Sequence, residues 1–357
     1  MDSRVKAKVD RLSTSVSNIR SALIDKGVDA TGHGAEDFAT DIANMPPTFD
    51  PDDYIFTVIN ENDEYKREYD YIGKGTIKLP DDKYGKKTRL VEVSIPKTVT
   101  SIGTRAFSGC SNLKHVNLQN IVSVNNYAFS GCFSLESIYA PNLTSIGDII
   151  PYAQSPGDFQ LTEFVAPKVT SLTGRTFFHD REHFYNLTYI DVRSATKIGK
   201  EACKRLPSLK DIKIDSAITI EDWAFVDCKK LVTDINLPNL TSLSGSAFQN
   251  TGISKVVNLG VITSISGSFD NCANLNFVRL PSTLTAINSF AFQRCGSSMT
   301  VICEAGTPPT YGSIAFTTSN VSVVYVPDDS VDAYKAASGW NSLASKIHPL
   351  SEYTGSD

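Results

Sequence analysis

The 357-residue sequence predicts an elongated solenoid whose short repeats stack into a parallel β-sheet. Three observations support this fold class. The dipeptide Ala-Phe recurs roughly every 21 to 26 residues, a Cys often lies three positions after the Phe, and a short alternating apolar segment precedes each dipeptide. One unit of this length cannot bury its apolar face alone, whereas stacked units bury a continuous core.

The aromatic turn is the clearest marker of the repeat, and we expect its Phe ring and its Cys thiol to pack into the same core. It occurs at Ala106-Phe107, Ala128-Phe129, Ala224-Phe225, Ala247-Phe248, Ala291-Phe292 and Ala315-Phe316, and its place is taken elsewhere by Ser268-Phe269, Thr176-Phe177 and Ala202-Cys203. The Cys that follows the turn is Cys110, Cys132, Cys228, Cys272 or Cys295.

The residues ahead of each turn predict a strand. Alternation over Leu90–Pro96 directs Val93 and Ile95 inward and Ser94 outward, and the following Thr100-Ser101-Ile102 supplies one more inward side chain. Eleven such strands begin near residues 90, 113, 135, 161, 187, 209, 232, 254, 275, 299 and 322. Stacked about 4.8 Å apart, they would make a parallel sheet roughly 50 Å long.

Residues 1–47 predict a separate helical segment for attachment or oligomerisation. Three heptads carry apolar residues at their a and d positions, and Gly27 follows as a helix stop. These residues are Val5, Val9, Leu12, Val16, Ile19 and Leu23. β-Branched residues at a and d favour a homotrimer. The alternative is one intramolecular hairpin with a second helix over residues 35–45, because short isolated helices are marginal.

The other boundaries follow from where the repeats begin and end. Residues 48–89 predict a β-rich N-terminal cap, with strands over residues 54–59 and 75–79 and a charged loop, 61–71, between them. The repeats occupy residues 90–321, and residues 322–357 form a C-terminal cap. We expect a last strand over 322–326 and a helix over 330–337 that Asp329 caps, with Trp340 and Ile347 covering the final coil.

Composition argues against several classes of function. The formal net charge is -5, so no general attraction to nucleic acid or to anionic membranes is expected. No run of 18 apolar residues predicts membrane insertion. The sequence lacks CxxC pairs, a phosphate loop, a dinucleotide fingerprint and a nucleophile elbow. We therefore expect no metal, no cofactor and no enzyme.

The repeats follow the pattern L-x-x-I-x-I-P-x-x-V-T-S-I-G-x-x-A-F-x-x-C, which resembles the BspA-like leucine-rich repeats of bacterial surface proteins, found also in phage and protist proteins. The resemblance covers residues 90–348 and includes a terminal segment, 325–340, that is common in that family. The pattern departs from the more familiar leucine-rich consensus, which has an Asn or Cys ladder after the strand. The resemblance implies a leucine-rich-repeat solenoid, with strands on one face and turns and helical turns on the other, used for recognition and adhesion.

The repeat cysteines are the first candidate site. A ladder of disulfides or metal ligands is one reading, but parallel disulfides need an oxidising compartment. We expect the five cysteines to be small, reduced and buried core residues.

The second candidate is the segment Thr176–Tyr185. His179 and His183 are four residues apart and could hold a metal with Glu182 or Asp180 on a helix, although a decorated turn in a long repeat is the expected alternative. Three aromatic residues here exceed what one repeat core needs, so we expect ligand contacts from Phe178, Phe184 and Tyr185.

The third candidate is the outward row of the sheet. It mixes Tyr, Asn, Asp, Lys and Arg, so a single-sign charged polymer is not expected, whereas aromatic and short polar side chains suit a protein or a glycan. The alternative is an ordinary solvated face. The candidate ligand-binding residues in this row are Tyr139, Tyr189, Asp191, Lys213, Asn236 and Arg279.

Together these features predict a non-enzymatic recognition protein. The first hypothesis is a phage virion component, a tail or head fibre that is assembled in the host cytoplasm with other virion proteins and binds a bacterial surface. It is based on the heptads and on residues 1–30, which lack the apolar run of an export signal. The second hypothesis is a BspA-like adhesin, at the cell surface or secreted, that binds a host protein or glycan and would need such a signal.

Overall fold

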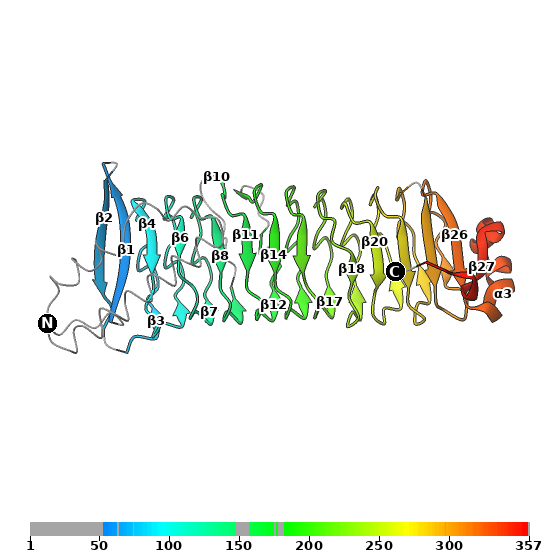
Figure 1. Cartoon of the computed structure of the whole chain (residues 1–357), viewed down its shortest axis with the longest axis horizontal. Helices are drawn as coiled ribbons and strands as arrows, with labels where there is room; N and C mark the ends of the chain where they lie inside the picture. The colour runs from blue at the N-terminus through cyan, green and yellow to red at the C-terminus, as the bar shows by residue number, and fades with distance from the viewer. Residues whose placement is uncertain are drawn as a thin grey trace.

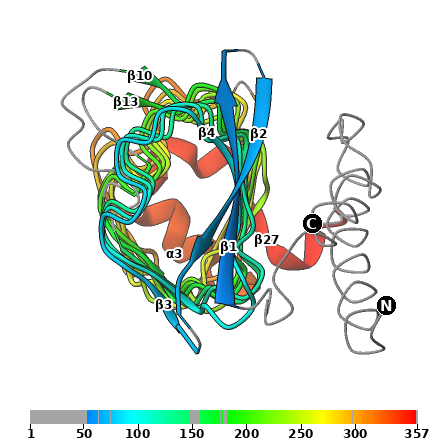
Figure 2. The ribbon, with the colours of Figure 1, turned by 90° about the vertical axis from the view of Figure 1, so that its left-hand side faces the viewer.

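The computed structural model describes residues 53–355 except 63, 74, 148–156, 175, 178–181 and 297. These residues form a straight stack of coils, with a β-hairpin at the N-terminal end and short helices at the C-terminal end (Figure 1). Seen along the stack, successive coils superimpose around one interior (Figure 2). The predicted solenoid is confirmed, whereas the helical segment expected over residues 1–47 lies outside the described residues.

Each of the eleven predicted strands exists, and together they form the first sheet of the solenoid. They are β4 (Leu90–Ser94), β6 (His115–Val116), β8 (Ser137–Tyr139), β11 (Glu163–Val165), β14 (Tyr189–Asp191), β16 (Asp211–Lys213), β18 (Ile235–Asn236), β20 (Lys255–Asn258), β22 (Phe277–Leu280), β24 (Met299–Cys303) and β26 (Val321–Val326). Neighbouring strands pair in parallel. The regular pairing divides the strands into three blocks. The first block ends at β6, the second runs from β8 to β16, and the third begins at β18.

The Thr-Ser-Ile segments form a second parallel layer, which the sequence did not predict. Its two-residue strands are β3 (Lys78–Leu79), β5 (Ser101–Ile102), β7 (Ser123–Val124), β9 (Ser145–Ile146), β12 (Ser171–Leu172), β15 (Lys197–Ile198), β17 (Thr219–Ile220), β19 (Ser242–Leu243), β21 (Ser264–Ile265), β23 (Ala286–Ile287) and β25 (Thr310–Tyr311). The layer is divided into three sheets, β3 to β9, β12 to β19 and β21 to β25. The Thr hydroxyls stabilise the stack: Thr196 donates to the carbonyl of Thr170 one coil earlier, at 3.3 Å. This side of the coil therefore carries strands, where the sequence interpretation expected helical turns.

The Ala-Phe turn reverses the chain with two left-handed residues per coil. Trp223 (φ 59°) precedes Ala224-Phe225, and Asp227 (φ 65°) follows it. The same pair of positive φ angles recurs at Ser246 and Asn250. A left-handed residue changes the direction of the chain sharply. In these turns the two left-handed residues flank one buried Ala and one buried Phe.

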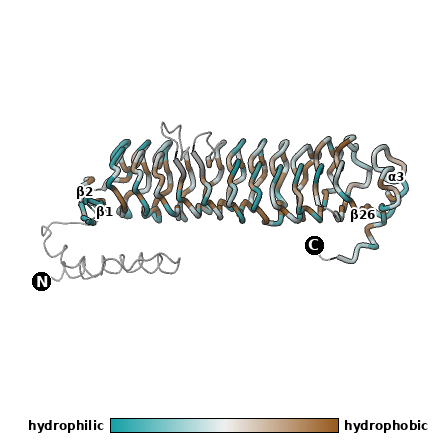
Figure 3. The backbone as a smooth tube through the Cα atoms, turned by 90° about the horizontal axis from the view of Figure 1, so that it is seen from above, coloured by the Kyte–Doolittle hydropathy of each residue, from teal (hydrophilic) through white to brown (hydrophobic). Residues whose placement is uncertain are grey.

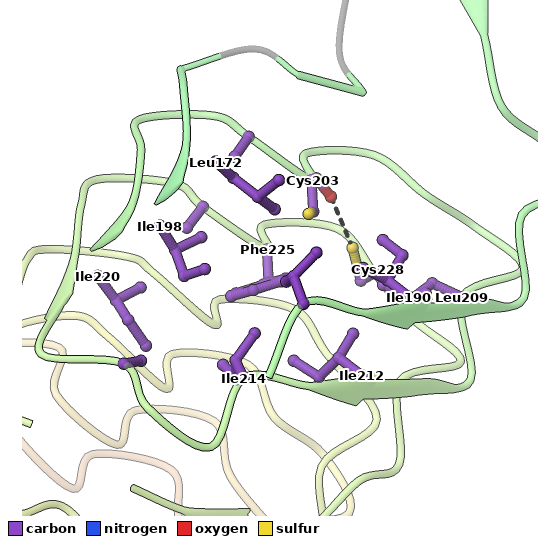
Figure 4. Packing of buried hydrophobic residues seen from close by; sticks show 14 of the residues in the cluster. Leu172, Ile190, Ile198, Cys203, Leu209, Ile212, Ile214, Ile220, Phe225 and Cys228 are labelled. Atoms are coloured by element: carbon purple, nitrogen blue, oxygen red, sulfur yellow. Dashed lines mark hydrogen bonds between the residues drawn. The ribbon is translucent and has the colours of Figure 1, made fainter. Parts of the chain in front are cut away.

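The Phe rings stack along the solenoid axis and form its core. Phe225 and Phe248 lie 5.1 Å apart, Phe248 and Phe269 lie 5.5 Å apart, and the planes of each pair are within 7° of parallel. Apolar positions recur in step along the coils (Figure 3), and their side chains meet inside each coil (Figure 4). Tyr84 adds a first ring to the stack, 5.4 Å from Phe107, so the first coil begins within the region expected to be a cap.

The ring stack is interrupted in the middle of the molecule. Cys203 stands where neighbouring coils have Phe, and Phe177 meets Phe184 edge-on, at 5.7 Å and 89°. Two short strands, β10 (Gly157–Asp158) and β13 (Glu182–His183), pair beside this region. A small apolar cavity lies at the interruption, lined by Phe129, Leu135, Ile138, Phe159, Leu161, Phe177 and Phe184.

The repeat cysteines are buried, as predicted, and their thiols bridge the coils. Cys272 Sγ donates to the carbonyl oxygen of Phe248, and Cys228 Sγ donates to that of Cys203, at 3.1 and 3.0 Å (Figure 4). In each case the acceptor occupies the aromatic position of the preceding coil. Burial raises the pKa of the Cys272 thiol to about 11, so the protonated, hydrogen-bonding form is favoured.

The N-terminal cap is an antiparallel hairpin. Its first strand, β1 (Tyr54–Glu61), pairs with β4 and confirms the strand expected over residues 54–59. The loop expected over residues 61–71 was wrong, because Glu64–Tyr71 form the strand β2 along β1. A strand at the end of a sheet has one unpaired edge, and charged side chains there discourage further pairing. For that reason the sequence of β2 resembles that of a charged loop.

The C-terminal cap closes the other end with η2 (Asp328–Ser330), α3 (Val331–Ala336), η3 (Trp340–Lys346), β27 (Ile347–Pro349) and η4 (Leu350–Glu352). Trp340 and Ile347 are buried against the last coil, as predicted, and Trp340 Nε1 donates to the carbonyl of Pro309 at 2.8 Å. The capping role expected for Asp329 was wrong. Ser330 precedes the helix and makes no side-chain capping bond, while Asp329 lies within η2. No helix among the described residues is long and apolar enough to span a membrane.

Candidate functional site

The outward face of the first sheet carries two columns of side chains, because each strand alternates. In β14, Ile190 points into the core while Tyr189 and Asp191 point outward. The register aligns Tyr139, Val165, Asp191 and Lys213 across β8, β11, β14 and β16. It aligns Ser137, Glu163, Tyr189 and Asp211 in the other column. Four of the predicted site residues, Tyr139, Tyr189, Asp191 and Lys213, are therefore brought together on one face.

Ion pairs hold the charged groups of this face in place. Arg193 donates to both carboxylate oxygens of Asp191, at 3.0 and 2.5 Å. Lys213 Nζ lies 3.4 Å from Asp211 Oδ2, and the Thr233 hydroxyl donates to the other oxygen of that carboxylate at 2.5 Å. Paired charges on short, well-packed strands lose little freedom when a partner docks, which lowers the entropic cost of binding.

Asp191 is a correction to the predicted contact residues. It is only 3% exposed, and its carboxylate is engaged by Arg193, whose side chain is about half exposed. Arg193 was missed because it lies two positions after Asp191, beyond the inward Val192, and alternation alone does not show that its long side chain reaches back. Asp191 positions Arg193, and Arg193 is the more accessible group of the pair.

The two tyrosines of the face differ in exposure. Tyr139 is 50% exposed and is the most exposed aromatic side chain of β8 to β16. Tyr189 is partly covered, and its burial, together with the negative charges of Asp191 and Asp211, raises the pKa of its hydroxyl. Its hydroxyl therefore stays protonated and can donate as well as accept a hydrogen bond.

The aromatic cluster predicted after Thr176 does not act as one surface site. Phe184 is buried and stacks on Phe159 with ring centroids 4.4 Å apart, so the expectation that it contacts a ligand was wrong. The long repeats here widen the core, and the extra rings fill it. Tyr185 is exposed, as expected, whereas Phe178 lies outside the described residues. His179 and Asp180 also lie outside them.

Asn236 and Arg279 lie apart from the central group, in the third block of the sheet. Asn236 of β18 is exposed and aligns with Asn258 of β20. Arg279 Nη1 donates to Glu304 Oε1 at 2.8 Å and is largely covered.

The C-terminal tail covers the outward face beyond Arg279, which sequence reasoning missed. Phe277 and Ile302 point outward, yet they are 7% and 0% exposed. The ring of Tyr353 lies on this part of the face, 6.4 Å from Phe277 and 5.2 Å from Tyr325. The chain returns from β27 toward β20, as Figure 1 shows. The tail therefore covers the face around β22 to β26 and leaves β8 to β16 accessible.

Among the described residues, no three or more His, Cys, Asp or Glu side chains gather in a way that could hold a metal ion. The six residues predicted to form the helical seam, Val5 to Leu23, lie outside the described residues, so the structure does not test their role.

Three comparisons relate this chain to known proteins. The model of the BspA type leucine rich repeat region matches it in six copies, over residues 77–189, 148–269 and 196–322. No curated protein matches the chain by sequence.

Several solved structures are similar to it. A leucine-rich repeat protein from Bacteroides ovatus is 21% identical with a TM-score of 0.50, over 76% of this chain and 68% of that one. A leucine rich cell surface protein from Faecalibacterium prausnitzii is 18% identical with a TM-score of 0.34, over 88% of this chain and 96% of that one. The pneumococcal vaccine antigen PcpA is 14% identical with a TM-score of 0.33, over 78% and 71%. The first of these likenesses supports the fold alone.

Proposed function

This chain belongs to the BspA-type leucine-rich repeat family, and on that basis we propose that it is a non-enzymatic recognition protein that binds a surface partner through the outward face of β8 to β16. Proteins with such repeats are usually surface or adhesion proteins. The observation that carries the proposal is the half-exposed Tyr139 on the same outward face as two ion pairs, Asp191–Arg193 and Asp211–Lys213. Aromatic and Arg side chains contribute most to interface energies when rigid neighbours surround them.

The proposal is tested by binding the full chain to defined surfaces. Labelled protein is applied to wells coated with fibronectin, laminin or collagen and to whole Gram-negative and Gram-positive cells. Tyr139→Ala and Arg193→Ala should each weaken retention on the surface that binds by at least about tenfold, as loss of a central contact does. Asn258→Ala on β20 is the matched control and should bind normally. If all three variants are retained as well as the parent chain, the outward face of β8 to β16 is not the binding surface.

We propose further that the protein is located on a virion, as a fibre that attaches to the particle through residues 1–47. The support is the heptad seam from Val5 to Leu23, which is apolar along one side. A cell-surface adhesin is the competing location, and the family favours it. Immunogold labelling distinguishes them, because the label falls either on particles or on the cell envelope.

Attachment through the seam has its own test. Leu12→Glu with Ile19→Glu should abolish assembly, measured by light scattering, and leave the melting temperature of the solenoid unchanged. If deletion of residues 1–47 changes neither the mass nor the incorporation into particles, the segment does not attach the protein.

A further inference from the structure

The turn side of the coils exposes two aromatic side chains that the proposed sheet-face function does not use. Trp223 is 40% and Phe290 47% exposed, and both directly precede the Ala of an Ala-Phe turn. Between them, the same turn position is occupied by Ser246 and Gly267. With coils spaced about 4.8 Å apart, the backbones of the two aromatic residues are about 14 Å apart. At this turn position, the only side chains between the two aromatic residues are the hydroxymethyl group of Ser246 and the hydrogen atom of Gly267.

Fold stability does not account for these aromatic residues. Trp223 has φ 59° and Phe290 has φ 64°, in the left-handed region that is unfavourable for a bulky side chain and easy for glycine. Gly267 adopts φ 62° at the same position, so the turn accepts glycine. Both aromatic side chains lie outside the buried core. Strained, exposed residues of this kind point to a function at the surface.

At this turn position, only small residues lie between the two rings. Lys200 and Lys204, both from the coil before Trp223, place their ammonium groups 4.9 and 5.6 Å from its ring centroid. The following coil offers only Ser246, so that side of the indole is not covered by a large residue at this position. Likewise, Gly267 leaves open the side of Phe290 that faces Trp223; a Cβ there would lie 4.0 Å from Phe290 Cβ.

A fixed row of amides lies along the same turns. Asn250 Nδ2 donates to Asp227 Oδ1 at 2.6 Å, and Asn271 Nδ2 donates to Asn250 Oδ1 at 3.0 Å. Gln249 Nε2 donates to Asp270 at 2.7 Å. An amide nitrogen carries two hydrogens, and each of these bonds uses one. The second N–H of each amide is not used by these bonds, and the bonds fix the orientation of the group.

From this arrangement we propose that the turn surface between Trp223 and Phe290 is a second binding site, and that its ligand is an oligosaccharide. The apolar faces of two sugar rings would pack on Trp223 and Phe290, while hydroxyl groups between them would bond to Asn250 and Asn271. A protein hot spot surrounds its aromatic anchors with a closed, desolvated rim. Here the floor between the rings is polar and open, which favours a ligand rich in hydroxyl groups.

The chain provides its own probe for this site. It has two tryptophans, and Trp340 is fully buried, so the fluorescence of an exposed indole reports on Trp223. The full chain is titrated with chitotriose, cellotriose, mannotriose and N-acetyllactosamine. At least one should shift the emission to shorter wavelength in a saturable manner. Calorimetry with that sugar should show at least a tenfold weaker affinity for Trp223→Gly and for Phe290→Gly, without a lower melting temperature.

The matched control is Tyr127→Gly, which changes an aromatic residue at the same left-handed turn position but outside the pair. It should bind the sugar like the parent chain. The proposal is overturned if none of the four sugars binds, if the control loses as much affinity as the two variants, or if Trp223→Gly lowers the melting temperature by several degrees. The sheet-face variant Tyr139→Ala should keep its sugar affinity, so the two proposals can fail separately.

Discussion

The thiol of Cys295 donates a hydrogen bond to the carbonyl oxygen of Phe269, 3.1 Å away in the preceding coil. The last coil has Ser319 in the same role, with its hydroxyl 2.5 Å from the carbonyl of Phe292. In these two coils the position holds a small donor, sulfur in one and oxygen in the other.

This relationship predicts the outcome of two near-isosteric substitutions. Cys295→Ser should retain the bond between coils, whereas Cys295→Val fills the space but cannot donate. The Val variant should lose about 1 kcal/mol more unfolding free energy than the Ser variant, the typical net value of one hydrogen bond. Urea denaturation of both variants measures the difference, and equal midpoints would show that the thiol acts only by filling space.

The buried thiols also predict how stability depends on pH. Burial raises the pKa of Cys110 and of Cys272 to about 11, above the value of about 8.5 for an exposed thiol. Their contribution is complete below pH about 8.5 and declines toward pH 11, because the unfolded chain loses these protons first. The urea midpoint should therefore fall between pH 8 and pH 10. The double variant with Ser at both positions should fall less, and an equal fall would assign the effect to other groups.

The ring stack predicts a large difference between a buried and an exposed Phe of the turns. Phe248→Ala removes a fully buried ring and should cost about 3–5 kcal/mol, as deep aromatic deletions do. Phe290→Ala changes an exposed ring and should cost less than about 0.5 kcal/mol. Calorimetric melting distinguishes them. A loss below about 1 kcal/mol for Phe248→Ala would show that the ring stack contributes little to stability.

The cover over the C-terminal end of the sheet predicts a change in surface hydrophobicity. Tyr353→Ala removes the ring beside Phe277 and Tyr325 and should expose an apolar patch that includes Phe277. Binding of the dye ANS should rise, while the melting temperature changes by only a few degrees because the core behind the sheet is intact. Glu352→Ala is the control. Unchanged dye binding would mean that other side chains cover the patch.

The sequence predicted the first sheet well because inward apolar residues recur in each repeat. It missed the second layer, since strands such as Ser264–Ile265 have two residues and show no alternation. It missed β2 for the opposite reason. An end strand buries neither face fully, so the segment 64–71 has the composition of a loop.

For the site, the sequence pattern predicted on which side of the sheet a residue lies but not which neighbours its side chain contacts. Alternation correctly placed Tyr139 and Lys213 on the outward face. It could not show that Asp191 is occupied by Arg193, or that Phe184 fills a widened core, because both depend on how far a side chain reaches. The tail over Phe277 could not be read from a repeat pattern, since it lies after the last repeat.

The break in the ring stack near Cys203 has a mechanical consequence. Phe107 and Phe129 belong to one run of stacked rings, and Phe225 to Phe292 belong to another. A solenoid transmits tension from coil to coil through its nearest neighbours, and the coils between these runs share fewer parallel ring contacts and enclose a cavity. Under a pulling force along its axis, the molecule should yield first between residues 130 and 224 and extend as two blocks joined by a stretched middle.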